Sequence, residues 1–247
     1  MNIHLRELNY EPPCAAMLAT PLNTQHFLAE LPLFREISSD QLARIAAGTT
    51  ELRAANGETL FQKGDICTGI HIVVYGHIKL VMSSAKGNEK VIILIGPGES
   101  FGEALMFTER PHVVYAQTLA DTLLLHIDKA VVFKEIERQP QLARKMLVQL
   151  SGRMLSLIGD LEAYSLHSGT QRVVDYLLHA ELDGESDGKT KILKISPTKG
   201  ILASRLNLTP EHFSRILHEL DSAQLIKVVG RAVTILDLDR LHNYASN

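Results

Sequence analysis

Residues 199–218 limit the possible folds of this chain more than any other segment, because they combine the residue types that a helix-turn-helix needs. Two short helices that cross closely need a small residue at the crossing, and Ala203 stands there. The tight turn needs a residue that tolerates positive φ, which Asn207 provides. Thr209 then caps a second helix that begins at Pro210. The segment therefore predicts a helix-turn-helix rather than an ordinary helical hairpin.

The same segment separates apolar from polar positions. The apolar ones recur at helical spacing and are predicted to face inward: Leu202, Leu206, Leu208, Phe213 and Ile216. The polar face of the second helix carries Glu211 and Arg215. In a DNA major groove, Arg binds guanine and Glu accepts a hydrogen bond from cytosine. The residues predicted to read double-stranded DNA are Thr209, Glu211, His212, Ser214 and Arg215.

Basic side chains near this motif can meet DNA phosphates. They are Lys199, Arg205, Arg215, Lys227 and Arg231. The formal net charge of the chain is −3. The acidic residues of the C-terminal half gather at 181–187, away from the second helix of the motif, which we call the reading helix. Residues 225–236 form two β-prone runs around Gly230, which predicts a wing with Arg231 at its tip. Lys199, Lys227 and Arg231 are expected to contact the DNA backbone.

Length and composition fit two domains of a globular protein, since the chain has 247 residues, 45% hydrophobic and 21% charged. No apolar run reaches the roughly twenty residues that a membrane span needs, and no signal peptide is evident, so we expect a cytoplasmic protein without membrane contact. Cys14 and Cys67 are the only cysteines. They are too few for a disulfide scaffold or a four-thiolate iron-sulfur cluster.

The residue pattern of the first half of the chain changes twice. Residues 1–23 contain several prolines without periodicity and are predicted to be a loosely ordered arm. A helical hairpin is expected over 24–47. It is followed by short apolar runs broken by glycines, with strands at 70–75, 91–95 and 122–127. Residues 24–137 therefore predict a β-barrel or jelly-roll domain.

Residues 138–167 predict a long helix with a coiled-coil seam. Its apolar residues recur at alternating steps of three and four: Leu147, Leu150, Met154, Leu157, Leu161 and Tyr164. A helix-turn-helix protein usually reads a palindrome as a dimer. We therefore predict that this helix forms the interface of a homodimer, ahead of a winged helix-turn-helix domain at 168–247. The alternative is a helix packed along its own barrel.

A barrel, a long helix and a winged helix-turn-helix in this order resemble the CRP/FNR family of bacterial transcription regulators. The motifs that carry the resemblance are residues 57–65, residues 96–105 and the reading helix. The resemblance implies an α+β chain: a cyclic-nucleotide-binding-type β-barrel that senses an effector, a dimerisation helix and a DNA-binding domain. It also implies RNA polymerase as a partner.

The reading helix is closer to some members of this family than to others. Glu211, Ser214 and Arg215 match the pattern of the FNR and DNR branches, which implies a TTGAT-N4-ATCAA operator. CRP-type helices have an arginine where this chain has Pro210. The resemblance therefore favours the FNR and DNR branches over CRP.

The effector is predicted by comparison with the same branches. Gly102 and Glu103 match the Gly-Glu pair of the CRP effector pocket. Val113 and Val114 replace the Arg-Ser pair that holds the phosphate of cyclic AMP, so cyclic AMP is not expected, although Arg110 stands nearby as a substitute. A cyclic-nucleotide effector stays an alternative. So do another organic effector and a regulator that needs no ligand.

The oxygen sensor FNR uses four cysteines, which this chain lacks, so no iron-sulfur cluster is expected. The cluster-less DNR-like branch remains, and its members are associated with haem-bound nitric oxide and with denitrification genes. The resemblance therefore implies haem b as a cofactor. An axial ligand is often a histidine. The candidate ligands are His26, His71, His126 and His167.

An enzyme is the main alternative class, because barrels of this type also occur in metal-dependent cupins. Cupins need a His-x-His pair inside the barrel, and this chain has none. Residues 96–102 come near a dinucleotide-binding pattern, but the third glycine comes one residue too late. We therefore expect no catalytic residues.

Overall fold

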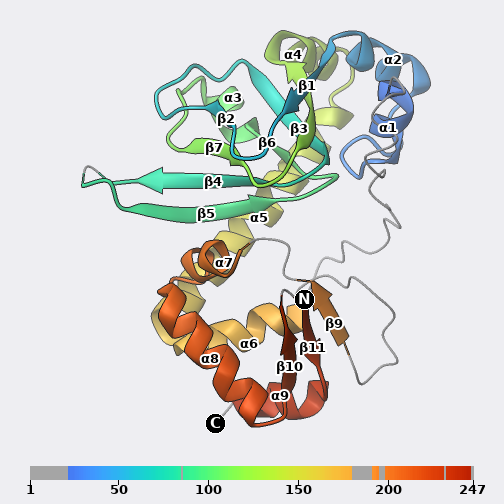
Figure 1. Ribbon diagram of the computed structural model, residues 1–247. Helices are drawn as coiled ribbons and strands as arrows, with labels where there is room; N and C mark the ends of the chain where they lie inside the picture. Colours follow the sequence, from blue (N-terminus) through green and yellow to red (C-terminus); the bar gives the residue numbers. More distant parts are fainter. Residues whose placement is uncertain (1–21, 85, 180–190, 195–197, 231, 246–247) are drawn as a thin grey trace. The chain divides into compact units, whose positions relative to one another are not determined.

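The computed structural model describes residues 22–84, 86–179, 191–194, 198–230 and 232–245 (Figure 1). The chain divides into two compact units, Met1–Leu155 and Ser156–Asn247. The division falls inside helix α5 (Gln141–Leu166), which contributes to both units. Nearly all of the predicted N-terminal arm, residues 1–23, lies outside the described residues, as does Arg231.

The first unit begins with helices α1 (Thr24–Glu30) and α2 (Ser39–Ala47). The strands that follow are β1 (Thr49–Ala54), β2 (Thr59–Phe61), β3 (Gly69–Tyr75), β4 (Ile78–Ser83), β5 (Glu89–Ile95), β6 (Ser100–Phe101), β7 (Tyr115–Thr118) and β8 (Thr122–Asp128). Helix α3 (Glu103–Thr108) separates β6 from β7, and α4 (Lys129–Arg138) follows β8.

These strands form two antiparallel sheets, in the orders β1-β8-β3-β6 and β2-β7-β4-β5. Alternate residues of a strand face opposite sides of its sheet. The space between the sheets is filled by Val73, Ile78, Ile95, Phe101, Ala116 and Leu124. On the other face of the first sheet, Ile70 and Ile72 of β3 and Leu125 and Ile127 of β8 pack in one core with residues of α1, α2 and α4 (Figure 1).

Gly102 fixes the place where β6 passes into α3. Its φ is 102°, in the left-handed region that side chains rarely adopt. A Cβ atom there would stand 2.8 Å from the carbonyl oxygen of Gly69. This turn is therefore built for glycine, and it sets Glu103 at the buried start of α3.

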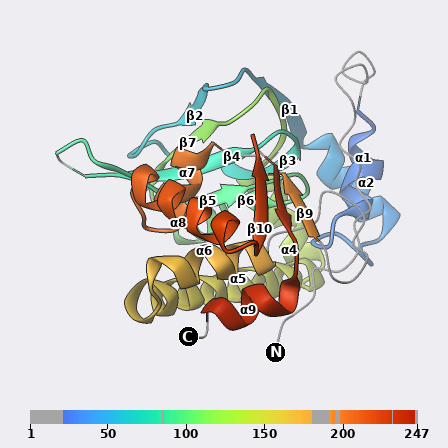
Figure 2. The same ribbon diagram turned by 60° about the horizontal axis from the view of Figure 1, so that its bottom comes forward.

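The second unit contains the last turns of α5 and then α6 (Gly169–His179), β9 (Lys191–Lys194), α7 (Lys199–Arg205), α8 (Pro210–Ser222), β10 (Ile226–Val229), β11 (Ala232–Ile235) and α9 (Leu238–Ala245). The strands form one antiparallel sheet in the order β10-β11-β9. Helix α6 packs beside α9 and α8 (Figure 2). The core includes Val173, Leu177, Leu202, Phe213, Leu217 and Val233.

The predicted fold class is confirmed, with the barrel formed as a sandwich of two sheets. Strands expected at 70–75, 91–95 and 122–127 occur as β3, β5 and β8, each within two residues of its expected ends. The predicted wing is the β10–β11 hairpin. Arg231, which was predicted for its tip, lies outside the described residues. Among the described residues, no helix has both the length and the apolar character to span a membrane.

Candidate nucleic-acid interface and sensor site

The helix-turn-helix forms from α7 and α8 with the predicted residues in the predicted roles. Ala203 is fully buried, and its carbonyl oxygen accepts a hydrogen bond from the Leu208 amide at 2.9 Å. Asn207 adopts a φ of 58° in the turn. The Thr209 hydroxyl accepts a hydrogen bond from the His212 amide at 3.2 Å and caps α8. The two helices are thus held at a close, fixed crossing.

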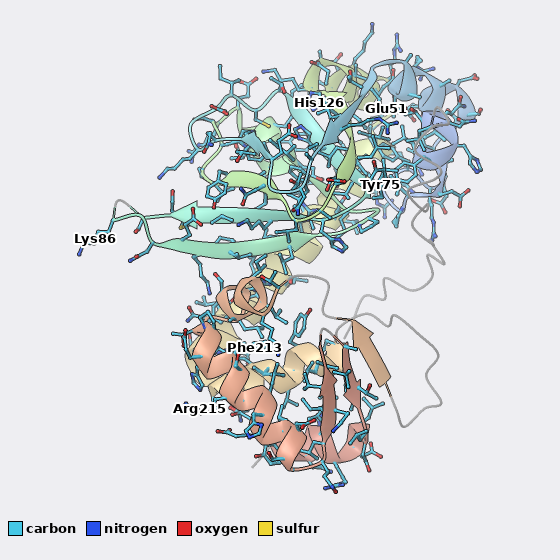
Figure 3. The ribbon with its side chains drawn as sticks, viewed as in Figure 1. Glu51, Tyr75, Lys86, His126, Phe213 and Arg215 are labelled. Carbon is cyan, nitrogen blue, oxygen red and sulfur yellow. The ribbon has the colours of Figure 1, made fainter. Side chains whose placement is uncertain are left out.

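Helix α8 presents a polar face to solvent. Glu211, Ser214 and Arg215 are exposed, and His212 is half-buried. Figure 3 shows Arg215 on the outer side of α8, whereas Phe213 points into the unit, where it is fully buried. Arg215 Nε lies 3.8 Å from Glu219 Oε1, and both side chains are at least half exposed. Such a surface pair is weak, so Arg215 can exchange it for a DNA base.

The predicted phosphate contacts have different environments. Lys199 at the start of α7 and Lys227 on β10 are exposed, as a contact with DNA requires. Arg205 is instead turned toward α5, where its guanidinium binds Asp160 Oδ2 at 2.7 Å and the Tyr164 hydroxyl at 2.7 Å. The Arg205 guanidinium is therefore bound to side chains of its own chain rather than free to meet a phosphate, which the sequence did not indicate.

The predicted seam of α5 is largely open to solvent. Leu147, Met154, Leu157 and Leu161 are 46–65% exposed, and Leu150 is half-buried. Tyr164, the last predicted residue of the seam, is half-buried and donates a hydrogen bond to the Arg205 carbonyl oxygen at 2.5 Å. The seam thus ends in a residue that is bonded to α7 in its own chain.

The apolar surface of α5 is wider than the predicted seam. Val148, Leu155 and Ile158 are also more than half exposed, and they lie beside the seam rather than on it. Monomeric proteins seldom leave so many large apolar side chains of one helix in water. The heptad pattern did not include these residues, because a two-stranded seam uses only two positions of each seven.

Glu103 is buried and already bound by α5. Only 2% of the residue is exposed. Its Oε2 lies 3.1 Å from Arg153 Nη1, and its Oε1 accepts a hydrogen bond from the Ser100 hydroxyl. Gln149 Nε2 also donates to that hydroxyl, at 2.7 Å. The Gly-Glu turn is therefore linked to α5 by two side chains, Gln149 and Arg153, whose role is not evident from the sequence.

The two residues that replace the phosphate-binding Arg-Ser pair are apolar. Val113 is more than half exposed and Val114 is half-buried, and neither supplies a cation or a hydrogen-bond donor from its side chain. Arg110, the substitute considered from sequence, is exposed on the segment after α3.

Two of the four candidate haem ligands come together inside the sandwich. His71 on β3 and His126 on β8 are direct register partners, and their ring centroids lie 4.6 Å apart. His71 stacks on Phe101 at 5.0 Å. His112, which the sequence analysis did not select, stacks on Phe61 at 3.6 Å. The result is a cluster of imidazole and phenyl rings, which we call the histidine cluster: His71, His112, His126, Phe61 and Phe101.

The environment of the cluster favours neutral imidazoles. The Nδ1 atoms of His71, His112 and His126 are buried and have no hydrogen-bond partner among the described residues. Burial, with smaller contributions from the other two histidines, lowers the pKa of His71 to about 3. Burial also lowers the pKa of His126 and His112, while Asp128 and Asp65 respectively oppose this shift.

The other two candidate ligands lie elsewhere. His26 is exposed on α1. His167 Nδ1 lies 3.0 Å from Asp175 Oδ2 in the second unit. Cys67 is buried, and burial raises the pKa of its thiol. Among the described residues, no group of three or more His, Cys, Asp or Glu side chains is arranged to hold a metal ion.

Comparison with known proteins identifies both units. The model of the cyclic nucleotide-binding domain matches residues 51–139, and that of the Crp-like helix-turn-helix domain matches residues 171–244. The "Probable transcriptional regulator flp" of Lacticaseibacillus casei is 27% identical over 217 residues, covering 88% of this chain and 97% of the relative. The "CRP-like cAMP-activated global transcriptional regulator" of Mycobacterium tuberculosis is 22% identical, covering 87% of this chain and 96% of the relative.

A solved structure shows the same fold at lower identity. FixK2 from Bradyrhizobium japonicum aligns with a TM-score of 0.71 at 20% identity, covering 79% of this chain and 96% of that chain. These relatives are transcription regulators and not enzymes, which argues against the cupin-like alternative.

Proposed function

Because the chain belongs to the CRP/FNR family of DNA-binding transcription regulators, we propose that it acts as a homodimer on a TTGAT-N4-ATCAA palindrome. The exposed polar face of α8 carries this proposal. Glu211, Ser214 and Arg215 lie on the first turns of a helix that Thr209 caps, the end that enters the major groove in helix-turn-helix proteins. Their order is the one that the TTGAT-type half-site implies.

The base-reading role of Arg215 can be tested by measuring binding to the palindrome, to a variant with one G·C pair replaced, and to random DNA. Arg215→Ala is expected to weaken palindrome binding by about 1–3 kcal/mol, roughly 5- to 150-fold, and to remove the preference for the replaced pair. Arg240→Ala is the matched control, because Arg240 is an exposed arginine on α9. Equal losses on palindromic and random DNA would contradict the assignment.

The exposed apolar face of α5 supports the dimer. A second copy of the same helix offers a matching surface, and two-fold pairing would cover Leu147, Met154 and Leu161 of both copies. Two reading helices about 34 Å apart could then enter successive major grooves. The alternative of a helix packed along its own barrel describes the face of α5 that carries the buried Leu142 and Met146, but not the exposed seam residues.

Sedimentation of two leucine variants tests the dimer. Leu161→Asp places a charge in the seam and is expected to shift the protein to monomer. Leu166→Asp is the control, because Leu166 is 74% exposed but lies outside the seam positions. A Leu161→Asp protein that stays dimeric would exclude the proposed interface.

We propose haem-bound nitric oxide as the first effector to test, on the family resemblance. The histidine cluster as packed does not fit a haem, because the rings of His71, His126 and Phe101 contact one another and leave no space for a porphyrin between them. His26 and His167 belong to other surroundings, and the four histidines do not form one site.

An absorption spectrum of the protein titrated with ferrous haem and then nitric oxide, with operator binding measured in parallel, tests this effector. A stoichiometric Soret band and operator binding by the nitrosyl form would support it. Titration with cyclic AMP belongs in the same experiment, and we expect no saturable binding because Val113 and Val114 offer no phosphate ligand. Unchanged operator binding in both titrations would favour another organic effector or a regulator without a ligand.

We also propose contact with RNA polymerase, as expected of a transcription regulator of this family. Transcription from a promoter with the palindrome at different distances from the start site tests this contact. A response that depends on that distance would support a direct contact, and simple blocking at every position would argue against it.

A further inference from the structure

The end of α5 is joined to the helix-turn-helix through one arginine. Arg205, the last residue of α7, donates from Nη2 to Asp160 Oδ2 at 2.7 Å and from Nη1 to the Tyr164 hydroxyl at 2.7 Å. That hydroxyl donates in turn to the Arg205 carbonyl oxygen at 2.5 Å. We call these three residues, Arg205, Asp160 and Tyr164, the Arg205 clamp. Arg205 is hydrogen-bonded to both of the others.

The clamp is more than an exposed surface pair. The Arg205 and Asp160 side chains are 21% and 26% exposed, and their bond joins two charged groups at short range. Asp160 and Tyr164 are four residues apart, so they lie on one face of α5 and meet the same guanidinium. An arginine that binds two partners from one helix resists rotation of that helix against α7.

A second arginine reinforces this connection on α6. Arg172 Nη1 donates to the carbonyl oxygen of His167, directly after α5, at 3.1 Å. Its Nη2 donates to the carbonyl oxygen of Asn207, the turn residue of the helix-turn-helix, at 3.4 Å. Two guanidinium groups therefore connect the end of α5 to residues 205–207.

The clamp stands between the proposed dimer interface and the reading helix. Leu161, in the exposed seam of α5, directly follows Asp160 in the chain. On the other side, Arg205 is two residues from the turn residue Asn207, and α8 begins at Pro210. A displacement of the last turns of α5 is therefore passed to the turn that orients α8.

We infer that Arg205 is a positioning residue for DNA recognition, held by Asp160 and Tyr164 so that α8 keeps a fixed orientation to the dimer helix. The inference rests on the proposed dimer, because only in a dimer does this orientation set the distance between two reading helices. It gives Arg205 a role different from the phosphate contact expected of a basic residue beside the motif. The clamp determines which half-site spacing the protein accepts, without touching DNA.

Binding to a series of operators tests this role. The series contains a single half-site and palindromes with spacers of two to six base pairs. Asp160→Ala and Arg205→Met break the clamp, and Tyr164→Phe removes only the hydroxyl. The matched control is Glu162→Gln, since Glu162 is an exposed acid on the same helix. Circular dichroism establishes that each variant is folded.

The wild type and Glu162→Gln are expected to prefer the four-base-pair spacer. In Asp160→Ala and Arg205→Met, affinity for that palindrome should fall about 10- to 100-fold, as expected for losing a hydrogen bond to a charged group. Affinity for the single half-site should stay within about twofold, because the α8 side chains are unchanged. The double variant should lose no more than Arg205→Met alone, since both changes remove the same bond.

Two results would overturn the inference. One is an unchanged spacer preference in the folded Asp160→Ala and Arg205→Met proteins. The other is an equal loss on the half-site and on every spacer, which would make Arg205 a general support or a phosphate contact. A wild type without any spacer preference would instead overturn the proposed dimeric function, and the inference would fall with it.

Discussion

The two units of the molecule place polar side chains in their interiors in different ways. In the sandwich, the histidine cluster keeps three buried Nδ1 atoms without a hydrogen-bond partner among the described residues. In the helix-turn-helix unit, Arg205 is charged and its guanidinium binds both Asp160 and Tyr164. An imidazole can avoid the cost of burial by staying neutral, whereas a guanidinium cannot and needs partners. The histidine cluster should therefore respond to pH, and Arg205 should respond to the loss of a partner.

The largest loss of stability is expected from breaking the buried charge pair of the first unit, Glu103 with Arg153. Arg153→Met leaves the Glu103 carboxylate buried with only its Ser100 hydrogen bond, so the free energy of unfolding of the first unit should fall by about 2–3 kcal/mol. Urea denaturation measures the loss. Arg144→Met on the exposed side of α5 is the control, and Glu103→Gln added to Arg153→Met should recover part of the stability. An Arg153→Met protein as stable as wild type would show that the pair has no structural role.

Acid should destabilise the sandwich through the histidine cluster. The pKa of His71 is about 3 in the folded unit, against 6.5 for a free imidazole, so the folded state binds fewer protons. This contribution to stability is complete above pH 6.5 and is lost as the pH falls toward 3. At pH 5, His71 alone should cost about 2 kcal/mol, and His112 and His126 act in the same direction.

Urea denaturation at pH 7.5 and pH 5.0 measures this loss of stability. Pulse-labelled hydrogen exchange, with the same pulse pH in every sample, follows the unfolding of β3 and β8. His71→Phe should reduce the difference between the two pH values, because a phenyl ring takes no proton. His26→Gln on exposed α1 should leave the difference unchanged. Equal pH dependence in wild type and His71→Phe would mean that His71 does not carry the effect.

A smaller effect is expected in the second unit. Tyr164→Phe removes the hydroxyl that bonds to Arg205, and the unit should lose about 1 kcal/mol, since Asp160 still binds the guanidinium. Thermal denaturation of Tyr164→Phe beside Tyr244→Phe, a change at an exposed tyrosine of α9, measures it. A loss as large as that of Arg153→Met would show that Asp160 alone does not hold the Arg205 guanidinium.

The smallest change in stability is expected from a substitution within α5. An added Cβ at Gly159 meets no atom within 4 Å, and glycine lowers the stability of a helix interior. Gly159→Ala should therefore stabilise the protein by about 0.5–1 kcal/mol, seen as a higher melting temperature of the monomeric Leu161→Asp variant. A lower melting temperature would show that Gly159 is needed within its own chain.

The helix-turn-helix was predictable because its requirements are local. Ala203, Asn207 and Thr209 act within a few residues of their own positions, and their spacing in the sequence is their spacing in the motif. The strands of the sandwich were predictable for the same reason. The register of β3 with β8 joins residues far apart in the chain, so the pairing of His71 with His126 could not be inferred from alternation alone.

The contacts of α5 were missed for a different physical reason. Glu103 and Arg153 are fifty positions apart and meet only because α5 packs on the first unit. Arg205 carries the same charge as the lysines predicted to bind DNA phosphates, so its sequence position favoured a DNA contact over a bond to Asp160. The type of a residue determines its charge, but its binding partner is known only once the fold is known.

The most direct test of the proposed regulator is the affinity of the wild type for the intact palindrome relative to the same duplex with one half-site scrambled, with the mass of each complex measured. We expect two copies of the chain on the palindrome and binding at least tenfold tighter than to the scrambled duplex. Equal affinities, or one copy on the intact palindrome, would contradict the account of a dimer that reads two half-sites with α8.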